Sequence, residues 1–112
     1  MNITKSVNYT KRDNVKAGVA VDTVQEHNGE VLVLTGFLFG SKYNEEDDKE
    51  VEVVVLKTAD DNFISSISKT VKDSAETIVS SFTEEEISEG IEIVVKSKKS
   101  KGGRDFFYLD LK

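Results

Sequence analysis

The residues best suited to bind another molecule lie near the C-terminal end of the chain. Phe106 and Tyr108 stand there at alternate positions. Just before them, five basic residues gather around two glycines with no acidic residue between them: Lys96, Lys98, Lys99, Lys101 and Arg104. Single strands of nucleic acid are held by basic grooves that follow the phosphates and by aromatic rings on which the bases stack. This stretch therefore predicts a binding surface for a single-stranded polyanion.

Alternation along an extended strand divides the last aromatic residues between two faces. Phe106 and Tyr108 share a face with Arg104, whereas the other face is apolar throughout: Phe107, Leu109 and Leu111. We expect the apolar face to fill the core and the face with Phe106 and Tyr108 to meet a ligand. The alternative is that these two rings are buried and that the lysines only keep an exposed hairpin soluble.

Three further residues are candidate contacts. Phe37 and Phe39 alternate with the leucines of the segment 31–39, so they face outward if those leucines fill the interior. Burial of both rings beneath a helix, or in a subunit interface, remains the alternative. Lys16 belongs to a second, N-terminal group of basic residues and is included in the predicted nucleic-acid surface.

No pattern in the chain indicates catalysis. His27 is the only histidine and stands beside Asn28-Gly29, in a predicted turn, and the chain has no cysteine. A nucleophile with its base therefore has no obvious candidates. The run of acidic residues from Glu45 to Asp48 lacks the alternating spacing of a calcium loop, and no phosphate-binding glycine motif is present. We expect no catalytic residue, no metal and no cofactor.

Length, charge and cysteine content limit the possible classes of protein. A chain of 112 residues fits a single domain, 1–112. The net charge of −6 argues against a nucleic-acid partner, but the acidic residues are concentrated in 44–50 and 84–92, apart from the basic stretch 96–104. The absence of cysteine favours the cytoplasm. We expect neither a signal peptide nor a membrane span.

The hydrophobic pattern predicts a mainly β domain with one principal helix. Alternation predicts strands in 15–24, 31–39, 51–57, 91–96 and 104–111, with Asn28-Gly29 as a hairpin turn. Three- and four-residue spacings predict a helix over 64–82, capped by Ser65 or Ser66, and Thr83 with Glu86 predicts a capping box for a short second helix that ends near Gly90. This order matches the five-stranded Greek-key OB-type barrel, with its helix between strands three and four. A generic α+β sandwich is the alternative.

The stretch VEVVVLKTADDNFISSISKTVKDSAETIVSSF and the closing SKKSKGGRDFFYLDL resemble small single-stranded DNA-binding proteins of phages of low-GC Gram-positive bacteria, the lactococcal phage type. The resemblance covers residues from about Lys16 onward. It implies an OB fold, sequence-independent binding of single-stranded DNA in phage replication or recombination, and a dimer or tetramer. The chain carries no tryptophan and no acidic tail after Leu111, so we expect stacking on Phe and Tyr and no tail-mediated partner recruitment.

The sequence thus favours a single-stranded DNA-binding protein of the host cell cytoplasm that forms a homo-oligomer. Phage or host replication and recombination proteins are its possible protein partners. The main alternative is a protein–protein adaptor or regulatory module with no nucleic-acid role. On that view the helix and the acidic loops form the interface.

Overall fold

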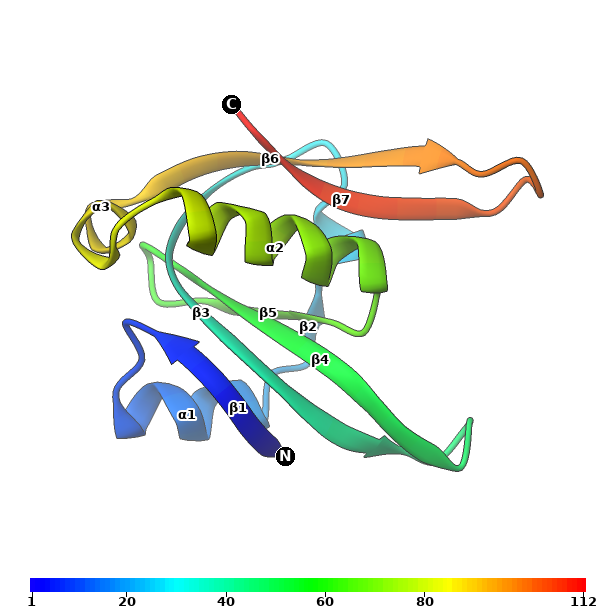
Figure 1. Ribbon diagram of the computed structural model, residues 1–112, viewed down its shortest axis with the longest axis horizontal. Helices are drawn as coiled ribbons and strands as arrows, with labels where there is room; N and C mark the ends of the chain where they lie inside the picture. The colour runs from blue at the N-terminus through cyan, green and yellow to red at the C-terminus, as the bar shows by residue number, and fades with distance from the viewer.

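The computed structural model describes residues 1–112 and places them in one curled, seven-stranded sheet with three α-helices and one 3₁₀ helix (Figure 1). The strands are β1 (Asn2–Val7), β2 (Asp22–Thr23), β3 (Val31–Asn44), β4 (Lys49–Thr58), β5 (Phe63–Ser66), β6 (Ile91–Lys99) and β7 (Asp105–Leu111). The helices are α1 (Lys11–Gly18), the 3₁₀ helix η1 (Val24–His27), α2 (Lys69–Ser81) and α3 (Glu84–Glu89). The prediction of a mainly β fold is confirmed, and the sheet has seven strands where the sequence predicted five.

The long strand β3 organises the sheet. Its whole length from Leu34 onward pairs antiparallel with β4. Along its other edge it pairs first with β6 and then with β1. Apart from β1, the strands lie across the sheet in the order β2-β5-β4-β3-β6-β7. Strands β5 and β7 therefore do not pair with each other. The sheet therefore curls into a half-barrel that stays open between the edge formed by β2 and β5 and the edge formed by β7.

A β-bulge in β3 decides which aromatic rings are buried. The pairing of β3 with β4 shifts register between Leu34 and Gly36, so Thr35 is an extra residue in its strand. The shift exchanges the two faces, and both Leu34 and Phe37 point into the main core. A Cβ at Gly36 would lie 3.0 Å from the carbonyl oxygen of Val7. Glycine is therefore the residue that allows β1 and the bend in β3 to come this close.

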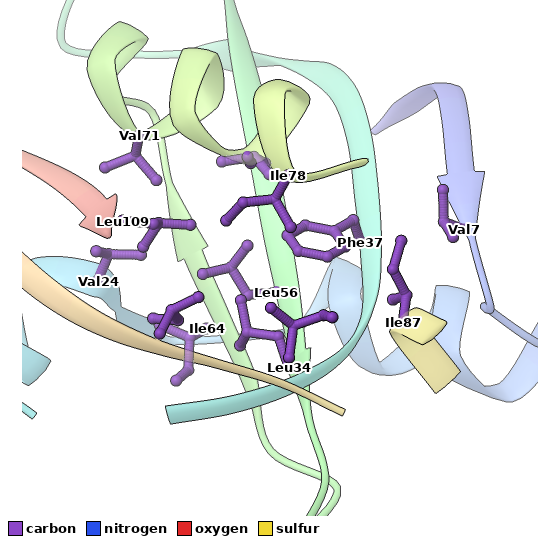
Figure 2. Close-up of a cluster of buried hydrophobic side chains, with 14 of the residues drawn as sticks. Val7, Val24, Leu34, Phe37, Leu56, Ile64, Val71, Ile78, Ile87 and Leu109 are labelled. Carbon is purple, nitrogen blue, oxygen red and sulfur yellow. The ribbon is translucent and has the colours of Figure 1, made fainter. Parts of the chain in front are cut away.

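The predicted outward position of Phe37 and Phe39 is thus wrong. Phe37 is completely buried and Phe39 is 4% exposed, and their stacked rings belong to the core beneath α2. Figure 2 shows Phe37 below Ile78 of α2 and close to Leu34 and Leu56. The position of these rings in the main core follows from the bulge, because strict alternation through Thr35 would have turned them to the opposite face of the sheet from Leu34.

Both faces of the sheet carry a core. The larger cluster lies on the α2 face and includes residues of nine elements, from Val7 of β1 to Leu109 of β7. The smaller one lies under α1 and contains Leu38, Val53, Val55, Phe63 and Ala17. Cover on both faces explains why β3 and β4 are apolar at consecutive positions.

The helical region contains one confirmed and one wrong prediction. Thr83 and Glu86 form the expected capping box at the start of α3, and Gly90 after its end has a φ of 109°. The helix predicted over 64–82 is α2, and it begins only after Ser68. The hydroxyl oxygen of Ser68, and not that of Ser65 or Ser66, accepts a hydrogen bond from the amide of Val71. Ile64 belongs to strand β5 and not to the helix. Its burial comes from the sheet, and its spacing to the helical residues is coincidental.

The prediction of a strand over 15–24 is also wrong, because only Asp22–Thr23 (β2) of this range forms one. Residues Lys11–Gly18 form α1, which begins with a capping box between Thr10 and Asp13. Asp13 is buried and lies 2.9 Å from Nζ of Lys57. Burial opposes its charge, but hydrogen bonds from Thr10 and Lys57 together hold the pKa of Asp13 below its ordinary value. These polar contacts outweigh the alternation of valines, which leaves Val19 and Val21 exposed.

Asn28-Gly29 forms a turn, but not the predicted hairpin between two strands. The turn joins η1 to β3. The neighbouring His27 lies between two carboxylates, with Nε2 at 2.8 Å from Asp22 and Nδ1 at 2.8 Å from Glu30. Burial disfavours the charged ring, yet the hydrogen bond and charge of Asp22 and the charge of Glu30 raise the pKa of His27. His27 is therefore a structural link between β2 and the start of β3.

The raised pKa of His27 predicts that the protein loses stability as the pH rises. A raised folded-state pKa contributes stability that is complete below the unfolded value of about 6.5 and vanishes above the folded value. We expect the melting temperature to decline as the pH rises from about 6.5 through the raised pKa. In His27→Gln, which cannot titrate, this decline should be absent. Thermal unfolding across pH 6 to 9 measures both proteins, and equal slopes would contradict the assignment.

Candidate nucleic-acid interface

Strands β6 and β7 form a hairpin whose outer half extends beyond the body of the molecule (Figure 1). The register places Lys96 opposite Tyr108 and Lys98 opposite Phe106. Residues directly opposite each other in an antiparallel pair share one face. The two predicted rings and these two lysines therefore lie together on one face, which we call the outer face of the hairpin.

The rings of the outer face are near neighbours. The centroids of Phe106 and Tyr108 are 6.5 Å apart and their planes are inclined by 41°. Both side chains are half-buried, so part of each ring is open to solvent. Nζ of Lys98 lies 5.2 Å from the centroid of Tyr108, within the range of a cation–π contact. The arrangement offers apolar ring surface beside a positive charge, which suits a base and its phosphate.

The cations of the hairpin are not equally free. Lys96 forms an ion pair with Asp110, with 2.5 Å between Nζ and Oδ2, and this hydrogen bond raises the pKa of Lys96. The other four make no ion pair with any acidic group and are exposed: Lys98, Lys99, Lys101 and Arg104. These four cations are available to phosphates, whereas Lys96 is already neutralised.

The free cations are distributed around the hairpin. Lys99 lies opposite Asp105, one position out of phase with Lys98, so it lies on the inner face together with Phe107. Lys101 and Arg104 stand at the turn, which is closed by a hydrogen bond from the amide of Ser100 to the carbonyl of Arg104. Positive charge is therefore present on both faces of the hairpin and at its tip.

Two parts of the predicted site do not join this surface. Phe37 and Phe39 are in the core, as described above. Lys16 is exposed on α1, which lies at the other side of the molecule from the tip of the β6–β7 hairpin (Figure 1). The structure thus brings together the residues of the last two strands and leaves Lys16 apart from them.

The pattern of sequence alternation does not reveal how the hairpin is anchored. The hydroxyl of Thr70 donates a 2.6 Å hydrogen bond to the carbonyl of Phe107, and the amide of Leu109 donates to the hydroxyl of Ser74. Thr70 and Ser74 are one turn apart on α2, so they contact alternate residues along the free edge of β7. In the sequence, this anchor is visible only as two hydroxyl residues four positions apart on a helix. Their spacing does not show that β7 is the strand they contact.

Comparison with known proteins decides the family. Residues 7–112 match the model of the family described as Phage Single-stranded DNA-binding protein. The chain belongs to this family. The resemblance inferred from the sequence is therefore confirmed at the level of the phage single-stranded DNA-binding proteins. No curated protein and no solved structure matches the chain.

Two general properties of this phage single-stranded DNA-binding family member complete the description. None of its helices has the length and apolar character required to cross a lipid bilayer. No group of three or more histidine, cysteine or acidic side chains gathers in a way that could hold a metal ion.

Proposed function

We propose that this protein binds single-stranded DNA without sequence specificity through the outer face and tip of the β6–β7 hairpin. The observation that carries the proposal is the pair of part-exposed rings, Phe106 and Tyr108, beside cations that have no acidic partner. Membership of the phage single-stranded DNA-binding family supports the same activity. The activity is binding and requires no catalytic group.

The two kinds of group have separate tasks in this proposal. Each ring stacks on a base, a contact that tolerates any sequence because every base has a π-face. The four cations without an acidic partner neutralise the phosphates on either side of the stacked bases: Lys98, Lys99, Lys101 and Arg104. The net charge of −6 does not prevent this, because screening at physiological salt limits the reach of each charge to about 8 Å. The charges of the protein that lie closest to the bound DNA therefore determine the electrostatic interaction.

We also propose that the fold is an OB-type half-barrel. Three strands, a helix and two strands follow one another as β3, β4, β5, α2, β6 and β7, and α2 covers the core inside the curled sheet. In this interpretation β5 takes the place that the sequence analysis gave to 15–24. In this proposal β1, α1 and β2 are N-terminal additions to the barrel. They add two strands to the sheet and leave the order of β3 to β7 along the chain as in an OB barrel.

We propose a role in phage DNA replication or recombination, in the host cytoplasm. The family supports the connection to phage DNA. Assembly into a homo-oligomer and contacts with other replication or recombination proteins belong to the same proposal. Sedimentation of the protein with and without oligo-dT measures its oligomeric state directly.

Salt dependence is the decisive test of the proposed binding mode. Four available cations, each releasing about 0.7 counterions per neutralised phosphate, predict a slope near −3 when the logarithm of the association constant is plotted against that of the salt concentration. Titration with oligo-dT is followed through tyrosine emission, because the chain has no tryptophan. Duplex DNA of equal length, which cannot stack on Phe106 and Tyr108, should bind more weakly. An association constant that does not change with the salt concentration would overturn the proposal.

A further inference from the structure

The free edge of β7 is held by side chains of α2, which lies beside it (Figure 1). The hydroxyl of Thr70 donates to the carbonyl of Phe107 over 2.6 Å. The hydroxyl oxygen of Ser74 accepts from the amide of Leu109 over 3.0 Å. The first bond holds the peptide unit that precedes Tyr108, and the second holds the peptide unit that follows it. Because peptide units are planar, two hydrogen bonds to the helix together confine both backbone dihedral angles of Tyr108.

The two anchoring hydroxyls are themselves fixed within α2. Ser74 donates to the carbonyl oxygens of Thr70 and Val71, both at 3.0 Å. The hydroxyl proton of Thr70 goes to Phe107, so the hydroxyl of Ser68, 2.8 Å away, is the donor in its contact with Thr70. Ser68 is also the N-cap of the helix. The anchoring hydroxyls therefore cannot turn away from β7 without the loss of hydrogen bonds inside α2.

Apolar packing supports the same contact between strand and helix. Leu109 is buried and belongs to the main core together with Val71 and Ala75 of α2. Figure 2 shows Leu109 next to Val71. A shift of β7 along the helix would therefore cost buried contacts as well as both hydrogen bonds.

The other ring of the outer face has no such support. Phe106 lies two residues nearer the tip of the hairpin, opposite Lys98 of β6. No side chain of α2 forms a hydrogen bond with the peptide units on either side of Phe106, because the two anchors lie beyond it at Phe107 and Leu109. The backbone of Tyr108 is thus held from both β6 and α2, whereas that of Phe106 is held from β6 alone.

We infer that Thr70 and Ser74 are positioning residues for DNA binding, which hold the ring of Tyr108 in the orientation that stacks on a base. The inference rests on the proposed binding of single-stranded DNA at the outer face. A ring that is already in place loses little conformational freedom when the DNA binds, so more of the stacking energy contributes to affinity. A merely structural role would lower the stability of the protein and leave the affinity of its folded form unchanged.

The substitution Thr70→Val removes the hydroxyl and keeps the shape of the side chain. At a temperature where the variant is folded, its affinity for oligo-dT should fall by about 2- to 10-fold, the factor for one neutral hydrogen bond. The salt dependence should not change, because the number of neutralised phosphates stays the same. Thr70→Ser keeps the hydroxyl and should restore the affinity of the parent protein. Ser74→Ala removes the second anchor and should cause a loss of similar size.

Thr77→Val is the matched control on the same helix. Thr77 is exposed, and its hydroxyl donates only to the carbonyl of Asp73 within α2. This variant should bind oligo-dT as tightly as the parent protein does. Melting curves of all the variants identify the temperatures at which they are folded. Parental affinity in both Thr70→Val and Ser74→Ala would overturn the inference.

Double-mutant cycles identify the ring through which the anchors act. In a Tyr108→Leu background, Thr70→Val should cause no further loss of affinity, because the ring that it positions is absent. In a Phe106→Leu background, it should cause the same loss as in the parent protein. If Thr70→Val does not fold, Ser74→Ala replaces it in both cycles.

The outcomes separate this inference from the proposed function. If the parent protein binds oligo-dT and the anchor variant causes equal losses in both backgrounds, the positioning role fails while the hairpin proposal stands. If the parent protein does not bind oligo-dT at all, the proposed function fails, and the inference fails with it.

Discussion

Simultaneous replacement of Lys98, Lys99 and Lys101 by glutamate is expected to lower the affinity for oligo-dT by about 100-fold or more. An exposed ion pair contributes up to roughly 1 kcal/mol, so three lost pairs account for about this factor, and three new negative charges add repulsion. All three side chains are exposed and form no ion pair within the protein. The melting temperature should therefore remain within a few degrees of that of the parent.

A matched triple variant controls for net charge. Lys11, Lys16 and Lys42 are also exposed and unpaired, and they lie outside the β6–β7 hairpin. Their replacement by glutamate gives the same net charge as the hairpin variant, but we expect oligo-dT binding to be largely retained. The control also tests Lys16, which the sequence analysis included among the contacts. Equal losses in both variants would show that net charge, and not the hairpin, governs binding.

The substitution Phe37→Ala should lower the free energy of unfolding by about 3 to 5 kcal/mol, the usual cost of truncating a buried phenylalanine. Phe37 is completely buried in the larger core and its ring is stacked on that of Phe39. Domains of this size have a total stability of about 5 to 15 kcal/mol. The variant should therefore be at the margin of folding, as chemical denaturation followed by circular dichroism will measure.

A milder pair of substitutions distinguishes a core ring from a stacking ring. Phe37→Leu should reduce stability moderately and leave oligo-dT affinity unchanged under conditions where the protein is folded. Tyr108→Leu should leave most of the stability and reduce the affinity by the contribution of one stacked base, about 1 to 3 kcal/mol. If Phe37→Leu instead lost binding while it remained folded, the result would indicate that Phe37 contacts the DNA, as the sequence analysis expected.

The sequence by itself determined the local parts of the protein. The capping box of Thr83 and Glu86 forms as expected because both partners lie within one helical turn. Strands β6 and β7 also lie where alternation predicted them, with Leu109 in the core and Phe106 beside Tyr108 on the other face. These features depend on neighbours that are close along the chain, and a sequence pattern records such neighbours directly.

The alternation of valines was misleading between residues 15 and 24. The same residues are compatible with an amphipathic strand or with a short helix, and only distant contacts choose between them. Lys57 in β4 supplies the partner that lets Asp13 be buried at the start of α1. The choice therefore depends on a residue more than forty positions away, which no local pattern contains.

Tertiary structure alone decided the orientation of Phe37 and Phe39 and the incomplete closure of the half-barrel. One extra residue at the bulge, Thr35, reverses the faces of β3, and a reversal of this kind depends on the pairing of β3 with β4. The opening of the half-barrel depends on β5 and β7, which do not pair with each other. Local geometry follows from backbone preferences and side-chain spacing, whereas register and closure follow from which strands come together in space.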